Sequence, residues 1–420
     1  MCAAVLIVLD GAADRPERIL KGATPLRLAR TPNLDAIAHR GTGGLVQILP
    51  NRGAPQTHSG MLSLLGYPKE ALQAKRGCLE ASVVFGEMRR GCLYARGNLS
   101  SLVNGRIPSR RLNRDVSQAE ADLFVAALNT EVPSMVGFGC RFASYSTYRL
   151  SVEMDLGVSR AADAVTSTDP GYSTDEFSTP THQHDFEPTP SQPLTDTPAA
   201  LFTANAVNGV TDACGAVLDA HLQNAARRTA GRAPANHLLM RDFGVGLPAV
   251  QSFGERWGTT SKYYHDLPVE VGVARYLGMA EETAGCTEVT AAAFWDAAAR
   301  LLRDLDSYEF ICFHVKGPDE PGHDSDWRGK VHAIEVVDES LFAAVAGELE
   351  VRSDLKVAVT SDHATCWRVG THTSDDVPLI IADQGANNSD LRLTEEACGR
   401  GTLDIHHGWN LMRKLLGGTS

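Results

Sequence analysis

Residues Ala4-Val5-Leu6-Ile7-Val8-Leu9 form an apolar run that is followed at once by Asp10-Gly11. Six consecutive apolar residues predict a strand that is covered on both faces, as in a parallel sheet with helices on either side. No run of roughly 18 apolar residues occurs, so we expect no membrane span. No basic segment precedes the apolar run, which argues against a signal peptide and for the cytoplasm.

The same kind of pattern recurs near the other end of the chain. Short apolar strands are predicted at 309–315, 356–360 and 378–382, and helical stretches at 290–304 and 330–347 separate them. Thr31 is expected to cap a further helix that begins at Pro32. Strands that alternate with helices predict an α/β fold with a mostly parallel sheet flanked by helices.

The middle of the sequence has a different character. It holds short amphipathic pieces and a Thr/Pro/Asp-rich stretch at 166–198, which we expect to be a surface loop or partly disordered. Because 420 residues exceed what one core usually organises, we expect two domains. Residues 1–76 and 246–420 would form the sheet domain, and 77–245 an inserted α+β cap domain over it.

Charge and cysteine content narrow the possible partners. A net charge of −12 argues against nucleic acid, whose phosphate backbone requires a basic face, but not against a small phosphorylated substrate. The nine cysteines include no C-x-x-C pair, which indicates reduced thiols rather than a disulfide framework. The sequence does not predict an oligomeric state.

Acidic and histidine side chains follow several of the predicted strands. In an open parallel sheet the ligand crevice lies beyond the carboxyl ends of the strands, so such side chains can converge there. Together they form a mixed oxygen and nitrogen set suited to two divalent ions, with Mn²⁺, Zn²⁺ or Co²⁺ favoured over Ca²⁺ and Mg²⁺ possible. The six candidate ligands are Asp10, Asp319, His323, Asp362, His363 and His372.

Several segments resemble the archaeal-type cofactor-independent phosphoglycerate mutases of the alkaline phosphatase superfamily. The resemblance covers nearly the whole length and is densest at the two ends. It is carried by Val8-Leu9-Asp10-Gly11-Ala12-Ala13-Asp14-Arg15-Pro16, 31–41, Leu62-Ser63-Leu64-Leu65-Gly66-Tyr67, Arg76-Gly77, Arg96-Gly97-Asn98, 236–241, 314–326, Ser361-Asp362-His363 and 372–379. It implies an alkaline phosphatase-like core and metal-dependent phosphoryl transfer.

The resemblance also implies roles for individual residues. Asp319, His323 and His372 match the ligands of one metal, whereas Asp10, Asp362 and His363 match those of the other, together with the nucleophile. Counted back from Leu62, the position of the family's nucleophilic Ser is Thr57, which retains the hydroxyl. Ser59 is the competing candidate if the alignment slips by two residues. His314 is expected to orient a metal ligand, and Lys316 to be solvated or to assist the phosphoryl group.

Two departures from the family pattern concern the substrate. His58 stands where the family has an Asp beside the nucleophile, so it is either a proton donor or a loop residue. Val271, in Pro268-Val269-Glu270-Val271-Gly272, stands where the family has a Lys that helps to hold the phosphoryl group or carboxylate. Within 319–323, Pro321 and Gly322 argue against a regular helix.

Arginines are the expected ligands of the substrate anion, because a guanidinium binds phosphate or carboxylate through two parallel bonds. We expect solvated surface positions for Arg110 and Arg111. The candidates for substrate binding are Arg15, Arg96, Arg149 and Arg241.

Three functions remain open on these grounds. The first is a phosphomutase that acts on a small phosphorylated or phosphonate acid through a phosphothreonine intermediate. The second is a metal-dependent phosphohydrolase on the same fold, which the Thr nucleophile and the missing Lys favour. The third is a non-catalytic binding descendant, which retention of all six ligand types and a hydroxyl nucleophile disfavours.

Overall fold

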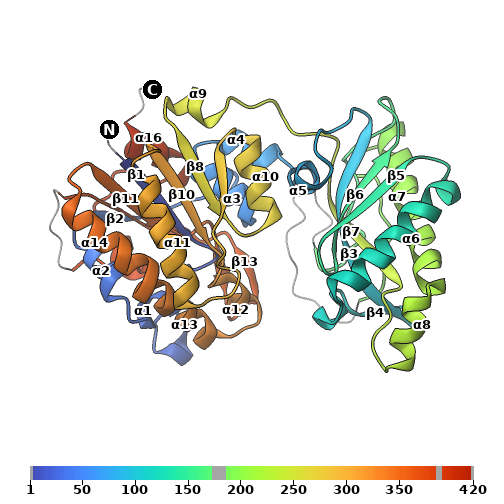
Figure 1. Cartoon of the computed structure of the whole chain (residues 1–420), viewed down its shortest axis with the longest axis horizontal. Coiled ribbons are helices and arrows are strands. Elements are labelled where there is room, and N and C mark those ends of the chain that lie inside the picture. Colours follow the sequence, from blue (N-terminus) through green and yellow to red (C-terminus); the bar gives the residue numbers. More distant parts are fainter. Residues whose placement is uncertain (1–2, 173–185, 385–389, 418–420) are drawn as a thin grey trace. The chain divides into compact units, whose positions relative to one another are not determined.

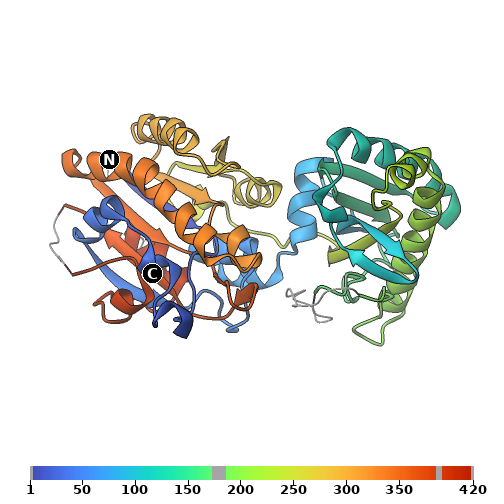
Figure 2. The ribbon, with the colours of Figure 1, turned by 90° about the horizontal axis from the view of Figure 1, so that it is seen from below.

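The computed structural model describes residues 3–172, 186–384 and 390–417. The chain divides into two units, of which unit 1 comprises Met1–Gln73 with Ala249–Ser420, and unit 2 comprises Ala74–Pro248. Each boundary lies three residues from the one expected from the sequence. Figures 1 and 2 show unit 1 as a sheet flanked by helices, and unit 2 as a second sheet with its own helices.

Unit 1 is built on a seven-stranded sheet in the order β2-β14-β11-β1-β10-β8-β9. The central strand β1 pairs in parallel with both β10 and β11, whereas β14 is antiparallel to its two neighbours. This confirms a mostly parallel sheet. The strands are β1 (Ala3–Leu9), β2 (Gly41–Val46), β8 (Ser261–His265), β9 (Ala280–Thr283), β10 (Phe310–Val315), β11 (Leu355–Thr360) and β14 (Val377–Ala382).

Helices cover both faces of this sheet. On one face, Val5, Ile7 and Leu9 of β1 pack in a single core with apolar residues of α2 (Pro32–Ala38), α11 (Ala291–Asp304), α13 (Trp327–Val337) and α14 (Ala343–Val351). On the other, the ring of Phe310 stacks on that of Phe253 in α9 (Phe253–Trp257), with centroids 4.9 Å apart. Burial on both faces explains the unbroken apolar run of β1.

Two details of these helices differ from the sequence-based expectation. Thr31 occupies the N-cap position of α2, but its hydroxyl donates to Asp35 and makes no capping bond to the backbone. The first turn is instead held by Asp338, whose carboxylate accepts from the backbone N–H of Leu34 at 2.8 Å. Asp338 opens a π-helical turn, Asp338–Phe342, that joins α13 to α14, so the predicted helix at 330–347 is continuous but locally widened.

Shorter elements complete unit 1. The helices are α1 (Pro25–Leu28), α3 (Thr57–Leu64), α4 (Pro68–Gln73), α10 (Pro268–Tyr276), α12 (Asp319–His323), α15 (Glu395–Gly399) and α16 (Leu411–Leu416), with single 3-10 turns at Arg18–Leu20 and Gly408–Asn410. A two-stranded sheet pairs β12 (Ala364–Cys366) with β13 (Thr371–Thr373). None of the helices in the described parts of the chain is both long and apolar enough to span a membrane.

Unit 2 is an antiparallel sheet with helices, an α+β arrangement. Strand β3 (Cys92–Val103) pairs with β4 (Arg106–Ser109), β6 (Arg149–Asp155) and β7 (His237–Gly244), and β5 (Cys140–Ser146) pairs with β6. A core that includes Leu150, Val152, Phe124 and Val207 joins the sheet to two long helices. The helices are α5 (Arg76–Phe85), α6 (Gln118–Val136), α7 (Pro198–Ala220) and α8 (Leu222–Thr229), with a 3-10 turn at Leu112–Arg114.

The Thr/Pro/Asp-rich stretch at 166–198 is a surface loop only in part, because residues 187–198 are mostly exposed as expected whereas the start of the stretch is buried. Thr166, Ser167, Thr168 and Asp169 are buried, and the backbone N–H of Thr168 donates to the carbonyl of Met240 at 2.9 Å. For these four residues the expectation failed because it weighed apolar content, whereas polar hydrogen bonds, including those to β7, hold them in place. Residues 173–185 of the stretch lie outside the described residues.

Candidate metal centre

The strand ends bring acidic residues together at one edge of the unit 1 sheet. Asp10 directly follows β1, Asp362 follows β11 two residues after its end, and α12 begins at Asp319, shortly after β10. Because β1 lies between β10 and β11 and is parallel to both, the three ends meet. The backbone N–H of Gly11 donates to Asp362 Oδ1 at 3.1 Å, which links the first segment of the chain to the last.

Gly11 makes the close approach of these segments possible. Its φ is +59°, a left-handed conformation that favours glycine. A Cβ at this position would lie 2.4 Å from Thr365 Oγ1 and 2.7 Å from Asp319 Oδ1. The Asp-Gly pair therefore serves two purposes, since it turns the chain and leaves room for the side chains of Asp319 and Thr365.

Three donor atoms form what we call the Asp319 triad. His323 Nε2 lies 3.5 Å and His372 Nε2 lies 3.6 Å from Asp319 Oδ1, and the two nitrogens are 3.2 Å apart. Donors placed about 2.1 Å from a tetrahedral metal lie roughly 3.4 Å from one another, so this spacing fits a divalent ion. The triad is brought together partly by α12, a single turn that the sequence did not predict. Pro321 is tolerated there because it lies in the first turn.

A second set, the Asp10 triad, comprises Asp10, Asp362 and His363. His363 Nε2 lies 3.1 Å from Asp10 Oδ1 and 3.2 Å from Asp362 Oδ2. All three atoms are buried and have no hydrogen-bond partner among the described residues. Buried polar atoms are nearly always satisfied, and three orphans that face one another are the donor set a cation would satisfy.

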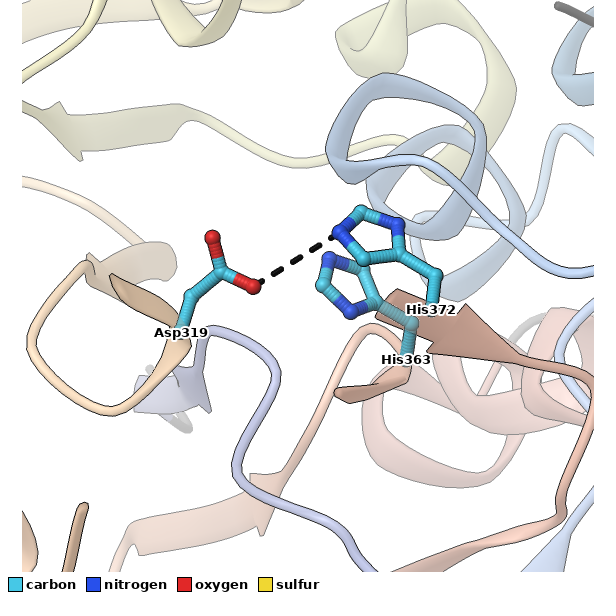
Figure 3. A group of neighbouring side chains, drawn as sticks. All are labelled: Asp319, His363 and His372. Carbon is cyan, nitrogen blue, oxygen red and sulfur yellow. Dashed lines mark ion pairs between the residues drawn. The ribbon is translucent and has the colours of Figure 1, made fainter. Parts of the chain in front are cut away.

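The two triads are contiguous. The rings of His363 and His372 stack with centroids 3.7 Å apart, and Figure 3 shows both facing Asp319. One donor atom each from Asp319, His363 and His372 lies within 4.8 Å of the others, and the same holds for Asp10, His314 and Asp362. His363 thus joins the sets, and His314 lies at the rim of the second.

Each of the three triad histidines has a partner for its other ring nitrogen. Nδ1 of His372 lies 2.7 Å from the carbonyl oxygen of Pro55, and Nδ1 of His323 lies 3.0 Å from that of Gly370. Thr365 Oγ1 donates to Asp319 Oδ1 at 2.7 Å and lies 3.1 Å from His363 Nδ1, so it accepts from that nitrogen. Because carbonyl oxygens only accept, Nδ1 carries the proton and Nε2 is free to bind a metal.

Lys316 connects the two triads, a role that its strand-end position did not reveal. Its ammonium group hydrogen-bonds to Asp10 Oδ2 and, at 2.7 Å, to Asp319 Oδ2. Burial tends to raise the pKa of Asp10, but the charge of Lys316 outweighs it and holds that pKa well below its usual range. The pKa of Asp319 is lowered by the same balance. Burial and the neighbouring His363 lower the pKa of His372 to about 4, so His372 is neutral near pH 7.

The predicted nucleophile begins helix α3 beside this centre. Thr57 is 3% exposed, and the preceding Pro55 accepts the hydrogen bond from His372. Three residues further, a Cβ on Gly60 would lie 2.4 Å from the carbonyl oxygen of Asp362, so the first turn of α3 packs directly against the Asp10 triad. Thr57 lies in the sequence between these two contact points.

The hydroxyl of Ser59, the competing nucleophile, hydrogen-bonds to the backbone at the start of α3. Its hydroxyl accepts from the backbone N–H of Gln56 at 2.9 Å and donates to the carbonyl of the same residue at 3.0 Å. Together with the Gln56 side chain it forms the capping box of α3. His58 is buried beside them, at 7% exposure.

Two of the predicted substrate arginines lie side by side in unit 2. Arg96 in β3 is paired in register with Arg241 in β7, and both are buried. Arg96 forms an ion pair with Glu80 at 2.6 Å, and Arg241 with Asp169 at 3.1 Å. Carboxylates of unit 2 therefore already balance part of their charge.

Arg110 belongs to the same cluster, contrary to the expected surface position. It makes two hydrogen bonds of 2.6 Å to Asp169 and lies over the ring of Tyr172. The expectation failed because Asp169 comes from a segment 59 residues away along the chain. Burial tends to raise the pKa of Tyr172, but Arg241, Arg110 and Arg96 outweigh it and lower that pKa to about 8.

The other two predicted substrate arginines are more exposed. Arg15 of unit 1 is paired with Asp375 at 2.8 Å, and its side chain is 48% exposed. Arg149 of unit 2 lies over the ring of Tyr148, with its guanidinium carbon 5.1 Å from the ring centroid.

Two further residues from the sequence analysis are partly buried. Arg111 is partly exposed, and Val271 lies half-buried on α10.

Buried groups around the triads were not found from the sequence. Lys330, which is fully buried, donates to Asp14 Oδ2 at 2.7 Å and to the carbonyls of Ala13 and Thr365. It therefore fixes the loop after Asp10 against β12. The signal was faint, because a lysine in an amphipathic helix usually faces solvent.

Comparison with known proteins gives one consistent relationship. Residues 3–413 match the family model described as the metalloenzyme superfamily. The 2,3-bisphosphoglycerate-independent phosphoglycerate mutase of Aeropyrum pernix is 34% identical over 423 residues, covering 98% of each chain. The mutase of the same name from Ignicoccus hospitalis is 32% identical, covering 98% of this chain and 96% of its own.

Solved structures share the fold of this chain. A structure from Pyrococcus horikoshii superposes with a TM-score of 0.75 and 26% identity, covering 99% of this chain and 97% of that one. A cofactor-independent phosphoglycerate mutase from Thermoplasma acidophilum superposes with a TM-score of 0.62 at 24% identity, covering 99% of both chains, which shows the shared fold.

Proposed function

The chain belongs to the metalloenzyme superfamily and to the family of 2,3-bisphosphoglycerate-independent phosphoglycerate mutases, and we propose that it is a two-metal phosphomutase acting through Thr57. The observation that carries this proposal is the pair of contiguous donor triads beside the first turn of α3. The substrate would be a small phosphorylated acid, and the names of the relatives point to phosphoglycerate.

Membership of a metalloenzyme family implies divalent metal ions, and the triads fit two of them. Asp319, His323 and His372 would hold one ion, and Asp10, Asp362 and His363 would hold the other together with Thr57. Mixed carboxylate and imidazole donors suit Mn²⁺, Zn²⁺ or Co²⁺, and Mg²⁺ remains compatible with the oxygen ligands. When bound, such ions lower the pKa of a hydroxyl nucleophile and neutralise charge on the phosphoryl oxygens.

Thr57 would attack the phosphorus atom in line with the leaving oxygen of the substrate. The bond between phosphorus and that oxygen breaks, and the phosphoryl group stays on Thr57 until a second hydroxyl of the same acid takes it back. Lys316, held between Asp10 and Asp319, is placed to offset negative charge. Arg15, Arg96, Arg149 and Arg241 remain the proposed ligands of the substrate's anionic groups.

A phosphohydrolase is the second candidate, because the resemblance implies a Lys that helps to hold the anion where Val271 stands, and a nucleophilic Ser where Thr57 stands. In that case water, rather than a second hydroxyl, would remove the phosphoryl group from Thr57.

We expect the protein to be located in the cytoplasm. The eight described cysteines support this expectation, because all are buried and none forms a disulfide.

One experiment separates the two candidates. The metal-loaded protein is incubated with 3-phosphoglycerate and followed by phosphorus NMR. A phosphomutase gives 2-phosphoglycerate until equilibrium, whereas a hydrolase gives inorganic phosphate. If neither product forms with any of the four metals, phosphoglycerate is not the substrate.

A further inference from the structure

A buried carboxylate on α10 makes two separate sets of contacts. Glu270 is 1% exposed, and its Oε2 accepts from the backbone N–H groups of Asp266 at 2.7 Å and Leu267 at 3.1 Å. This oxygen caps the start of α10. The other oxygen, Oε1, takes no part in the cap and lies 3.0 Å from His314 Nδ1.

His314 extends this contact toward the proposed metal centre. It lies on β10 on the opposite side of the strand from Phe313, which packs in the core described above. Its Nε2 lies 3.7 Å from Asp362 Oδ2, one of the orphaned atoms of the Asp10 triad. Neither ring nitrogen of His314 has a hydrogen-bond partner among the described residues, so Glu270 and Asp362 are the groups that face them.

The contacts thus run from α10 through β10 to the end of β11. Asp362 in turn accepts through Oδ1 from the backbone N–H of Gly11. Burial of a carboxylate or an imidazole costs free energy unless the group is paired. Here Glu270 is paired with His314, and His314 faces Asp362 of the Asp10 triad. Glu270 directly precedes Val271. It therefore lies in the segment where this sequence departs from the family pattern.

We propose that Glu270 is a positioning residue for the Asp10 triad: it fixes the orientation of His314, and His314 fixes the Oδ2 atom of Asp362. The proposal rests on the metal centre of the proposed function. It accounts for a carboxylate of which only one oxygen is used by the helix. Partners of this kind commonly contribute 10- to 100-fold to metal affinity.

A double-mutant cycle on the full chain tests the proposal. Wild type, Glu270→Gln, His314→Gln and the double variant are loaded with Co²⁺, and the release of each ion to a chelator is measured together with the thermal unfolding midpoint. Glu270→Gln should weaken one of the two ions by about 10- to 100-fold. The double variant should bind that ion no more weakly than His314→Gln alone, because the two residues act in series.

A matched control separates positioning from helix capping. Glu255 caps α9 in the same way, accepting from the backbone N–H of Ser252 at 3.0 Å, and it is exposed. Glu255→Gln should lower the unfolding midpoint slightly and leave both Co²⁺ affinities unchanged. If Glu270→Gln does not fold, Glu270→Asp, which keeps the charge but shortens its reach, should give the same loss of one ion.

The outcomes distinguish this inference from the proposed function. If Co²⁺ affinity is unchanged in both Glu270 variants, Glu270 is a helix cap only. The same conclusion follows if the losses of Co²⁺ affinity in the two single variants multiply in the double variant. Both conclusions hold whether or not the enzyme turns over. A wild type that binds fewer than two ions would overturn the inference and the metal centre together. A wild type that binds two ions, shows the expected cycle and fails on every phosphorylated acid would overturn only the proposed function.

Discussion

His323 Nε2 and His372 Nε2 lie 3.2 Å apart, although one residue ends a single helical turn after β10 and the other lies on the small strand β13. Each ring is held by a carbonyl oxygen at Nδ1, at Gly370 for His323 and at Pro55 for His372. The surrounding backbone therefore sets the orientation of two nitrogens that face one carboxylate oxygen of Asp319, which is the arrangement expected of the proposed metal site.

Removal of a triad ligand should remove one metal ion. We expect about two divalent ions per wild-type chain. Asp319→Ala and His372→Ala should each retain one. His332, which is exposed on α13, provides the control, and His332→Ala should retain two. Elemental analysis of the dialysed proteins measures the outcome. Full metal content in both triad variants would contradict the assignment.

The two hydroxyls near the start of α3 should respond differently to substitution. Thr57→Val keeps the shape and deletes the hydroxyl, so it should abolish turnover while the protein stays folded; Thr57→Ser should retain substantial activity. Ser59→Ala removes half of a capping box and should lower the free energy of unfolding by about 1 kcal/mol without abolishing turnover. Steady-state assays and urea unfolding separate these effects, and the reverse pattern would identify Ser59 as the nucleophile.

Substitution of Gly11 should damage both stability and metal binding. Gly11→Ala introduces a Cβ at a φ of +59° and places it 2.4 Å from Thr365 Oγ1. Gly22 is the matched control, because its φ is +80° and a Cβ there would meet nothing within 4 Å. Gly22→Ala should cost only backbone strain, about 1–2 kcal/mol. Gly11→Ala should cost more and also weaken metal binding. Equal losses in stability, with metal affinity unchanged, would show that the close approach has no effect.

Ionised Glu80 should stabilise unit 2, and this contribution should be lost at low pH. Glu80 is 1% exposed; burial tends to raise its pKa, but Arg96 and then Arg76 outweigh this and lower the pKa from 4.5 to about 2. A carboxyl with a depressed pKa stabilises the fold above its unfolded value of 4.5, and this contribution disappears as the pH falls through about 2. At neutral pH it amounts to roughly 3 kcal/mol, at about 1.4 kcal/mol per pKa unit.

Glu80→Gln tests this linkage. The variant should be less stable than wild type at pH 7, and the gap in free energy of unfolding should shrink as the pH is lowered from 4.5 toward 2. The free energy of unfolding is measured with denaturant at several pH values, and hydrogen exchange of the β3 amides is used to monitor unit 2. A gap that stays constant with pH would mean that the ionised carboxylate does not stabilise unit 2.

The sequence predicted best those features that depend on local pattern. An unbroken apolar run that ends in Asp10 was enough to predict a strand covered on both faces and a carboxylate at its end, because strand burial and chain direction are local properties. The contacts of Lys316 with both triads and of Glu270 with His314 were not predicted. These contacts are made with partners such as Asp10, 306 residues away from Lys316, and His314 on another element, which no periodicity reveals.

Polar burial explains the remaining differences. Asp169 was placed in a loop because its neighbours are polar, yet it is fully buried by hydrogen bonds to Arg110 and Arg241. Thr31 was expected to cap α2 by its residue type, but the buried Asp338 supplies that contact from another helix. In both cases a tertiary hydrogen bond outweighed a local preference.

Thr57 should carry the phosphoryl group during turnover, and peptide mapping can detect that covalent intermediate. Metal-loaded enzyme is mixed with 3-phosphoglycerate, quenched in acid within the first turnovers and digested with trypsin, and the peptide spanning 53–69 is sequenced by mass spectrometry. We predict one phosphoryl group on Thr57 in the wild type and none in Thr57→Val. A phosphoryl group on Ser59, or turnover without any phosphopeptide, would show that Thr57 is not the nucleophile.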